Sequence, residues 1–552
     1  MLTPPIGLYG RKITPEERQS WASEQIAAAD LIKDFAASTD SAVLLALVLR
    51  EFSWFAAKGA PQEARERVAE TLSSVPMSPD LRLVVALTGG TSAFGVDDID
   101  AASARQAALL TEVTRDMLAL YKGERLDKLE NMLREIDRAN IKTNAGLFFS
   151  TLAQESPDRG RSLVEHALEH VDCPLIAFAS PVLQVLRSGT PDETLPLLLR
   201  MAHNDREDVR ASLAGAYASA PWLNHPAEDD FACLRELIRT GNAGIKYRAA
   251  HALRWLAQAE PADRRLEFQR NGIEILLTVD IGEDPGLAEA VLESLDDQFG
   301  IPPDLVSGEQ LRSILKRLEP VTEITHGAYF LGRFLSYVAK RAPEQLLDYL
   351  LKRVGRAAQR QNKTRDYTPI PFGLEGLFSG VEDAGVHDAL LRKVALELSR
   401  SSGTRRYWLT QLFALVAGGF GPPALRLITE LSEEREEATY RLIATVLSAA
   451  PRGFAFANEE LCATLLERSE DISFEAHRAI HAALLTSTQS GSYSGALGQP
   501  SAAHESIRDQ ANEAARRLDR RPAGATFFRD VAKYAQETID RMLEHAQEYL
   551  IE

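Results

Sequence analysis

A short helical phrase recurs along the middle of this chain at intervals close to 40 residues. It stands at 205–218 (DREDVRASLAGAYA), 241–257 (GNAGIKYRAAHALRWLA) and 284–295 (DPGLAEAVLESL). Each copy has a polar start, then an aliphatic residue, then Ala and Leu at helical spacing. Arg210 lies 38 positions before Arg248, which lies 40 positions before the equivalent Ala288. A fixed period of this length in helical sequence is typical of stacked helix pairs, so we predict an all-α solenoid.

We expect the chain to contain several successive segments. They are an irregular helical region at 1–158, a repeat solenoid at 159–485, a flexible Ser- and Gly-rich loop at 486–503 and C-terminal capping helices at 504–552. Within the solenoid, Pro221 and Pro451 follow second helices and end them, because proline cannot continue a helix. We expect capping helices at the ends of the solenoid, because each repeat packs only on its neighbours and a terminal repeat has no neighbour on one side.

The middle stretch resembles HEAT repeats. The phrases Val209-Arg210, Tyr247-Arg248 and Asp284-Pro285 are similar to the second-helix pattern of those repeats. The resemblance covers about two thirds of the chain and implies a right-handed α-solenoid of HEAT-like helical hairpins, which specifies a fold and no activity.

The end of the chain looks like the tails of large bacterial NTPase-linked proteins of immunity and conflict systems. The phrases that carry this likeness are Tyr493-Ser494-Gly495, Gly498-Gln499-Pro500, Ile507-Arg508-Asp509 and Phe527-Phe528. In those proteins a helical repeat arm often senses a trigger, so the resemblance implies a component of a bacterial defence complex. The Gly-rich segment 89–95 (GGTSAFG) lacks the Lys-Ser/Thr of a phosphate loop, so such a role implies a partner or a further domain that carries the NTPase.

Charge and cysteine usage restrict the partners and the compartment. The chain has 62 Lys and Arg against 79 Asp and Glu, a net charge of −17, which argues against bulk attraction to nucleic acid or anionic membrane. Cys173, Cys233 and Cys462 are far apart, so we expect no disulfide framework, no Cys-based zinc site and a reducing compartment. The N-terminus lacks the order of a signal peptide, and glycines and prolines break the uncharged run 407–425. We therefore expect a cytoplasmic protein without a membrane span.

A local basic band stands out against the acidic background. Residues 351–365 (LKRVGRAAQRQNKTR) hold six bases and no acid, and a helical wheel places the bases on the outer side, opposite an apolar stripe. About one repeat later, more bases precede two aromatic residues that could stack on bases in a shared groove. The candidate binding residues are Lys352, Arg353, Arg356, Arg360, Lys363, Arg365, Arg405, Arg406, Tyr407 and Trp408. Three interpretations stay open: exposed charges balanced by neighbouring acids, docking of a protein, or binding of nucleic acid.

Two histidine pairs raise the question of metal binding. His166, Glu169 and His170 form an H-x-x-E-H pattern, which in inverted zincins binds zinc and supplies a general base. A repeat solenoid is the wrong context for that chemistry, so we interpret the pattern as a polar helix face. His477 and His481 fall inside an apolar stripe, and buried neutral histidines would make the C-terminal region acid-sensitive. Between 271 and 311 ten acids and no base occur, which indicates a solvated acidic face or a dock for a basic partner.

No catalytic residue, metal ligand or cofactor is assigned from the sequence. The pattern favours a non-enzymatic helical-repeat scaffold or sensor that binds a macromolecular partner, a protein in the first instance. The alternative is a nucleic-acid-binding solenoid that uses the basic groove around residues 352–408. A metal-dependent hydrolase built on His166, Glu169 and His170 is the third hypothesis.

Overall fold

The structure is a computed structural model. It describes residues 14–46 and 48, several residues between 66 and 84, and then 126–138, 145–321, 328–359, 367–488 without 372 and 375, and 502–549. The described residues form helices and turns, and none of them lies in a strand. The chain divides into two compact units, residues 1–279 and 280–552. The predicted boundaries at 158, 485 and 503 stay predictions.

Within its described residues, unit 1 contains an N-terminal helix and, from residue 126 on, a series of helix pairs. Its elements are α1 (Pro15–Ser38), α6 (Leu126–Arg138), α7 (Ala145–Glu155), α8 (Pro157–Glu169), η3 (Pro174–Phe178), α9 (Ala179–Gly189), α10 (Pro191–Ala202), α11 (Glu207–Ser219), η4 (Trp222–Asn224), α12 (Glu228–Thr240), α13 (Ala243–Ala252), η5 (Leu253–Gln258) and α14 (Arg265–Leu276). The helices expected at 194–202 and 209–218 correspond to α10 and α11.

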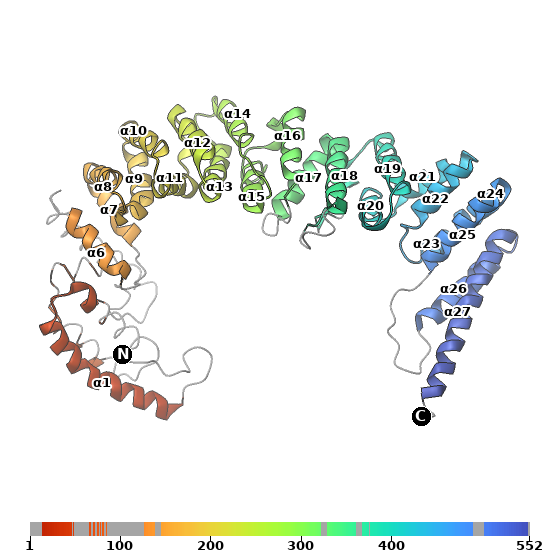
Figure 1. Ribbon diagram of the computed structural model, residues 1–552, viewed down its shortest axis with the longest axis horizontal. Coiled ribbons are helices and arrows are strands. Elements are labelled where there is room, and N and C mark those ends of the chain that lie inside the picture. Colours follow the sequence, from red (N-terminus) through yellow and green to blue (C-terminus); the bar gives the residue numbers. More distant parts are fainter. Residues whose placement is uncertain are drawn as a thin grey trace. The chain divides into compact units, whose positions relative to one another are not determined.

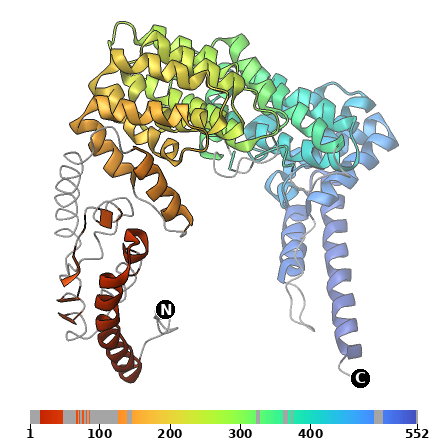
Figure 2. The ribbon, with the colours of Figure 1, turned by 60° about the vertical axis from the view of Figure 1, so that its left-hand side comes forward.

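Unit 2 continues the same pairing with less regular connections. Its elements are α15 (Pro285–Ser294), η6 (Pro303–Leu305), α16 (Gly308–Leu318), α17 (Ala328–Arg341), α18 (Pro343–Gln359), η7 (Leu377–Gly380), α19 (Ala384–Ser399), α20 (Gly403–Val416), α21 (Pro422–Glu433), α22 (Glu437–Leu447), α23 (Phe454–Ala457), α24 (Glu459–Ile472), α25 (Phe474–Thr488), α26 (Ala502–Arg517) and α27 (Pro522–Tyr549). The long α27 packs against α26 (Figure 2), and α25 continues three residues into the predicted loop.

The helices of unit 1 form two layers. In one layer α9, α11 and α13 pack successively on one another, and in the other α10, α12 and α14 do the same. Figure 1 shows the first layer as the lower row of yellow and green helices and the second as the upper row. Each helix contacts the next repeat through its layer and its own partner through the hairpin, which confirms the predicted all-α repeat solenoid.

Local sequence explains where these helices begin and which face they bury. Pro191 starts α10, where the missing N–H costs nothing, and the Asn242 side chain caps α13 by accepting a hydrogen bond of 2.9 Å from the Ile245 N–H. In α11 the apolar residues Val209, Leu213 and Tyr217 recur every four positions, and all three are fully buried. The 3.6-residue period of a helix places them on one face, toward the neighbouring helices.

Arginines join successive repeats by donating to carbonyl groups one repeat earlier in the chain. The guanidinium of Arg206 lies 2.9 Å from the carbonyl oxygens of Ala167 and His170, at the end of α8. Arg248 reaches Ala211 over 3.2 Å, Arg341 reaches Val306 over 2.9 Å, and Arg468 reaches Ser432 over 3.3 Å. Ala167 and Ser432 lie in the last turns of α8 and α21, where carbonyl groups have no intrahelical partner and an arginine satisfies them. Of the two arginines at the recurring position of the sequence phrase, Arg248 makes a bond to the preceding repeat.

The described residues between α18 and α19 in unit 2 are irregular apart from one short element. From Tyr367 up to α19 they form turns, bends and the short η7. Within this segment, η7 packs against α17 and α20.

The uncharged run at 407–425 is divided between two helices. It ends α20 at Val416 and starts α21 at Pro422, and Gly418 and Gly419 between them adopt positive φ angles of 61° and 75°. Glycine tolerates that conformation because it has no Cβ. Among the described helices, none is both long enough and apolar enough to span a membrane.

Candidate functional site

The basic band differs from the sequence prediction at its centre. Arg353 is only 3% exposed, so its placement on the outer side of the helix is wrong. Its guanidinium donates to five carbonyl oxygens, those of Leu318, Glu319, Val321, Thr368 and Pro369, at 2.8 to 3.4 Å. It also lies 4.8 Å from the ring centroid of Tyr367 and 5.7 Å from that of Tyr349. Arg353 therefore holds the irregular segment onto α16 and α18 and is closed to an outside ligand.

The other described cations of α18 share one acid. The ammonium of Lys352 lies 3.0 Å from one carboxylate oxygen of Glu319, and the guanidinium of Arg356 lies 3.6 Å from the other. Glu319 itself is only 7% exposed, so the pair of cations neutralises a charge that would be costly to bury alone. Arg360, Lys363 and Arg365 lie outside the described residues, and their part in binding stays a prediction.

The second half of the band lies at the start of α20, which packs against α18. Arg405 forms an ion pair of 2.8 Å with Glu397, and Arg406 donates to the hydroxyl of Ser448 over 3.2 Å. Tyr407 is 58% exposed and its ring meets Trp408 edge to face at 5.1 Å. The structure thus brings the two halves of the band onto neighbouring helices, with carboxylates beside several of the bases.

A cluster of aromatic and arginine side chains covers the outer face of α17. We call it the aromatic–arginine face and define it by Phe299, Tyr329, Phe330, Arg333, Tyr337 and Arg341. Tyr329, Arg333, Tyr337 and Arg341 are spaced four residues apart, which places them on one side of the helix. Phe299 and Tyr329 are 51% and 55% exposed, and Phe330 contacts both rings, with centroid distances of 6.3 and 5.3 Å.

The arginines of this face are held in place by the preceding connection. Arg333 forms ion pairs with Asp296, at 2.6 Å, and with Asp297, and its guanidinium lies 5.4 Å from the Tyr329 ring centroid. Arg341 donates to carbonyl groups of 304 and 306 and to the hydroxyl of Tyr337. Two acids of the predicted acidic run, Asp296 and Asp297, therefore serve to position a cation. Both arginines of the face are therefore held by contacts within the unit.

Unit 1 offers an open groove between η3, α9, α11 and α13. Its volume is about 580 Å³, and its lining residues include Ser180, Ser212, Gly215 and Arg248. The hydroxyl of Ser212 donates to the Ile176 carbonyl over 3.0 Å, and Arg248 lies over α11. The groove exists because the recurring phrase has small residues here, such as Ser212 and Gly215, and larger side chains at these positions would fill it.

The H-x-x-E-H pattern does not assemble as an inverted zincin site. His166 is on α8, but His170 lies beyond the end of the helix, where its Nδ1 contacts the His166 carbonyl oxygen at 2.9 Å. Its ring stacks on that of His166 with centroids 4.0 Å apart, while Glu169 is exposed. Glu169 therefore does not face a metal ion that His166 and His170 could bind together. For Glu169 and His170, the structure favours the interpretation as a polar helix end.

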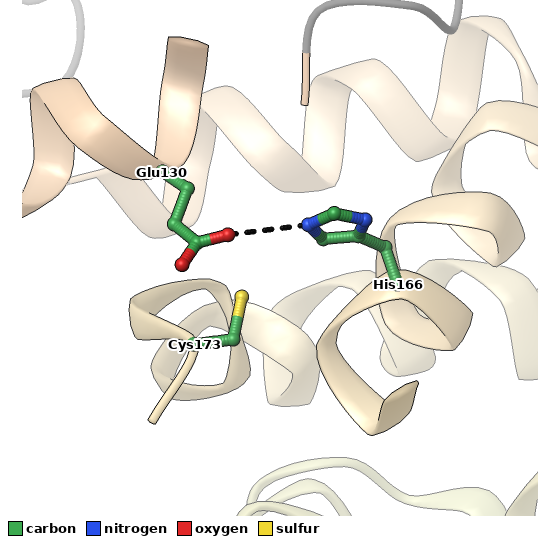
Figure 3. Close-up of side chains that lie close together, drawn as sticks. All are labelled: Glu130, His166 and Cys173. Carbon is green, nitrogen blue, oxygen red and sulfur yellow. Dashed lines mark hydrogen bonds and ion pairs between the residues drawn. The ribbon is translucent and has the colours of Figure 1, made fainter. Parts of the chain in front are cut away.

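His166 belongs instead to a different cluster (Figure 3). Its Nε2 lies 3.3 Å from a carboxylate oxygen of Glu130 on α6, and the two residues point toward Cys173 in the turn before η3. Burial acts to raise the pKa of Glu130, but hydrogen bonds from His166 and Arg134 outweigh it, and the pKa lies below its usual value. Burial raises the pKa of the Cys173 thiol, and the charge of Glu130 raises it further. All three cysteines are buried, and none of them forms a disulfide, in agreement with the sequence prediction.

Sequence reasoning missed both the aromatic–arginine face and the Glu130 cluster. The face had a local signal, the four-residue spacing of Tyr and Arg in 329–341. The cluster had none, because Glu130, His166 and Cys173 come from three separate elements, and an isolated cysteine carries no ligand spacing.

Comparisons with models of protein families and with curated proteins find no match to this chain. Among solved structures, the chain is similar to a circular tandem repeat protein with novel repeat topology and enhanced subunit contact surfaces, at 13% sequence identity. The alignment covers 96% of this chain and 99% of that one, with a TM-score of 0.14. At that TM-score the likeness carries no argument about the shape or the partners of this chain.

Proposed function

We propose that this chain is a helical-repeat scaffold that binds a protein partner through the aromatic–arginine face of α17. The observation that carries the proposal is the exposure of Phe299 and Tyr329, each about half exposed, beside Arg333, which is already held by ion pairs with Asp296 and Asp297. Tyrosine and arginine are enriched among the residues that supply most of the binding energy at protein interfaces, and phenylalanine is enriched in the interfaces themselves.

The way in which the arginines of the face are held supports this function. A flexible arginine loses side-chain entropy when it is immobilised by a partner, at about 0.5–1.5 kcal/mol for each side chain. Arg333 and Arg341 are held by hydrogen bonds within the unit, so much of that loss has occurred before binding. Exposed carboxylates such as Asp297 border the face and would form a polar rim around the rings.

Charge favours a protein over a nucleic acid as the partner. The chain carries a net charge of −17, and the described bases Lys352, Arg356 and Arg405 each lie beside a carboxylate. Phosphate contacts need cations whose counterions can be released, and a base already paired with an acid contributes less.

We further propose a role in a bacterial defence complex, with the partner supplying an NTPase or a nuclease. The support is the resemblance of the tail, in which Phe527 and Phe528 are buried in the packing of α27, and Arg508 donates to Gln536 over 3.0 Å. The cytoplasm is the expected compartment for such a complex.

Affinity co-purification from the native host, at low salt and with identification by mass spectrometry, tests the function. We expect a stoichiometric protein whose affinity for the double variant Phe299→Glu, Tyr329→Glu falls by about 1,000-fold, since each anchor is worth about 2 kcal/mol. Phe474→Glu is the matched control, because Phe474 is 76% exposed on α25 of the same unit, and it should bind as the parent does. Equal affinity of the double variant, or a nucleic acid as the bound molecule, would overturn the proposal.

A further inference from the structure

We propose that Glu130, His166 and Cys173 form a zinc site that ties α6 to the first repeat of the solenoid. One carboxylate oxygen, one imidazole nitrogen and one sulfur lie within 4.8 Å of one another, and they come from α6, α8 and the turn before η3. Figure 3 shows the three side chains directed into the same space. This inference is independent of the proposed function of α17.

The donor set is one that Zn²⁺ prefers. Thiolate, imidazole and carboxylate all bind zinc, with bonds of about 2.0–2.3 Å, so tetrahedral ligands stand about 3.3–3.8 Å apart. The oxygen of Glu130 and Nε2 of His166 are already 3.3 Å apart. The remaining separations, at most 4.8 Å, reach the required values by side-chain rotations that move a donor atom by about 1 Å. Solvent can supply the fourth ligand, because the side chains of Glu130 and His166 remain 12% and 13% exposed.

Charge is balanced in this arrangement. A carboxylate and a thiolate together neutralise one Zn²⁺ ion, and the thiol of Cys173 releases its proton when the metal binds. Cys173 is 1% exposed, and a buried thiolate is stable only beside such a cation.

A second shell orients the carboxylate. Arg134 donates to the Glu130 oxygen that does not face His166, and it also reaches the carbonyl of Asp172 over 3.4 Å. Ligating carboxylates are held by hydrogen bonds of this kind in known metal sites. Arg134 is thus a positioning residue, and its guanidinium stays on the far side of the carboxylate from the metal.

A zinc ion in this site would cross-link α6 to the first repeat. Cys173 and the η3 turn belong to the chain that follows α8, and α6 packs against η3. The ion therefore joins a helix that precedes the repeats to the end of the solenoid, where an uncovered repeat needs a cap.

Metal analysis of the full-length chain, purified without chelator and then dialysed against zinc-free buffer, tests the proposal. We expect about one zinc per chain, and after replacement by Co²⁺ a thiolate-to-metal charge-transfer band in the near ultraviolet. Cys173→Ser should abolish the band and the stoichiometric zinc. Arg134→Gln should weaken zinc binding by about 10–100-fold and leave the band in place at saturation.

Matched controls separate this site from other histidines and thiols. His170→Gln should keep the zinc, because His170 belongs to the sequence pattern and not to the cluster, and Cys462→Ala should keep it because Cys462 is buried in α24. If Cys173→Ser fails to fold, the test uses the unsubstituted protein. Zinc should raise its thermal unfolding midpoint by a few degrees, and a chelator should reverse the shift. Substoichiometric zinc without a thiolate band, or zinc that Cys173→Ser retains, would show adventitious metal only and overturn the site.

Discussion

Two repeats of this chain differ in how an arginine satisfies backbone carbonyl groups of the preceding repeat. In unit 1 the pair α12 and α13 has a complete second helix, and Arg248 on that helix makes one bond of 3.2 Å to the preceding repeat. In unit 2 the described residues 367–371 after α18 are irregular, and the buried Arg353 makes five bonds to carbonyl groups, two of them in this segment. A helix satisfies its own backbone groups, whereas an irregular segment needs an external donor. The comparison shows that one buried arginine supplies this donor where the described backbone is not helical.

The largest expected effect is the loss of Arg353. Arg353→Met should lower the free energy of unfolding of unit 2 by about 3–5 kcal/mol, because several buried carbonyl groups lose their donor at once. Urea unfolding followed by circular dichroism measures the change, and hydrogen exchange should report faster opening of segment 367–380.

The regular repeat supplies the control. Arg248→Met removes one bond from an exposed side chain and should cost about 0.5 kcal/mol. If the two substitutions cost the same, the five bonds of Arg353 stabilise the unit no more than the single bond of Arg248, and the comparison fails.

The regular repeats contain one buried charge of their own, which sharpens the comparison. Asp230 on α12 is fully buried, and its carboxylate accepts from Arg187 at 2.7 Å, from the Tyr217 hydroxyl at 2.9 Å and from the Ala227 N–H at 2.8 Å. Burial, followed by the charge of Asp230, raises the pKa of Tyr217 well above its usual value, so the phenol stays a donor.

Asp230→Ala should therefore destabilise unit 1 by about 3 kcal/mol, since Arg187 is left buried without its acid. Calorimetry or urea unfolding measures it. Glu437→Ala, which breaks the exposed pair with Arg441, should change stability by no more than about 0.5 kcal/mol. A small effect at Asp230 would mean that regular repeats depend on apolar packing alone.

Sequence reasoning succeeded where the signal was local and repeated. The recurring phrase and its pairing predicted α10, α11 and α13, and the 38-residue spacing of Arg210 and Arg248 indicated the repeat length. The break in the run 407–425 also followed from local chemistry, because Gly418 and Gly419 sit between two helices with positive φ.

The candidate site was less predictable because contacts between repeats decide it. A helical wheel places Arg353 beside Lys352 and Arg356, yet contacts with the chain at 318–321 and at 367–369 make it buried. In the same way, Cys173 appears isolated in the sequence, and only the packing of α6 on η3 brings Glu130 to it. No periodicity encodes either contact.

The smallest expected effect is a pH dependence at the C-terminal repeats of unit 2. His481 on α25 packs edge to face on Phe527 of α27 at 5.2 Å, and His477 lies one turn away. Burial lowers the pKa of His481 below its usual value near 6.5, the charge of His477 lowers it further, and Asp530 acts in the opposite direction. The unfolded chain therefore binds a proton at a higher pH than the folded chain does.

Stability of this region should consequently fall as the pH drops through 6.5 and should be constant above about pH 7.5, where both states are deprotonated. Urea midpoints between pH 5 and 8 measure the slope, and His481→Leu should flatten it. His203→Leu in unit 1 is the control, because His203 is exposed and bonds only to the Leu199 carbonyl oxygen among the contacts described. A slope that survives His481→Leu would place the acid sensitivity elsewhere, and the contact of α25 with α27 would then resemble the apolar packing of the regular repeats.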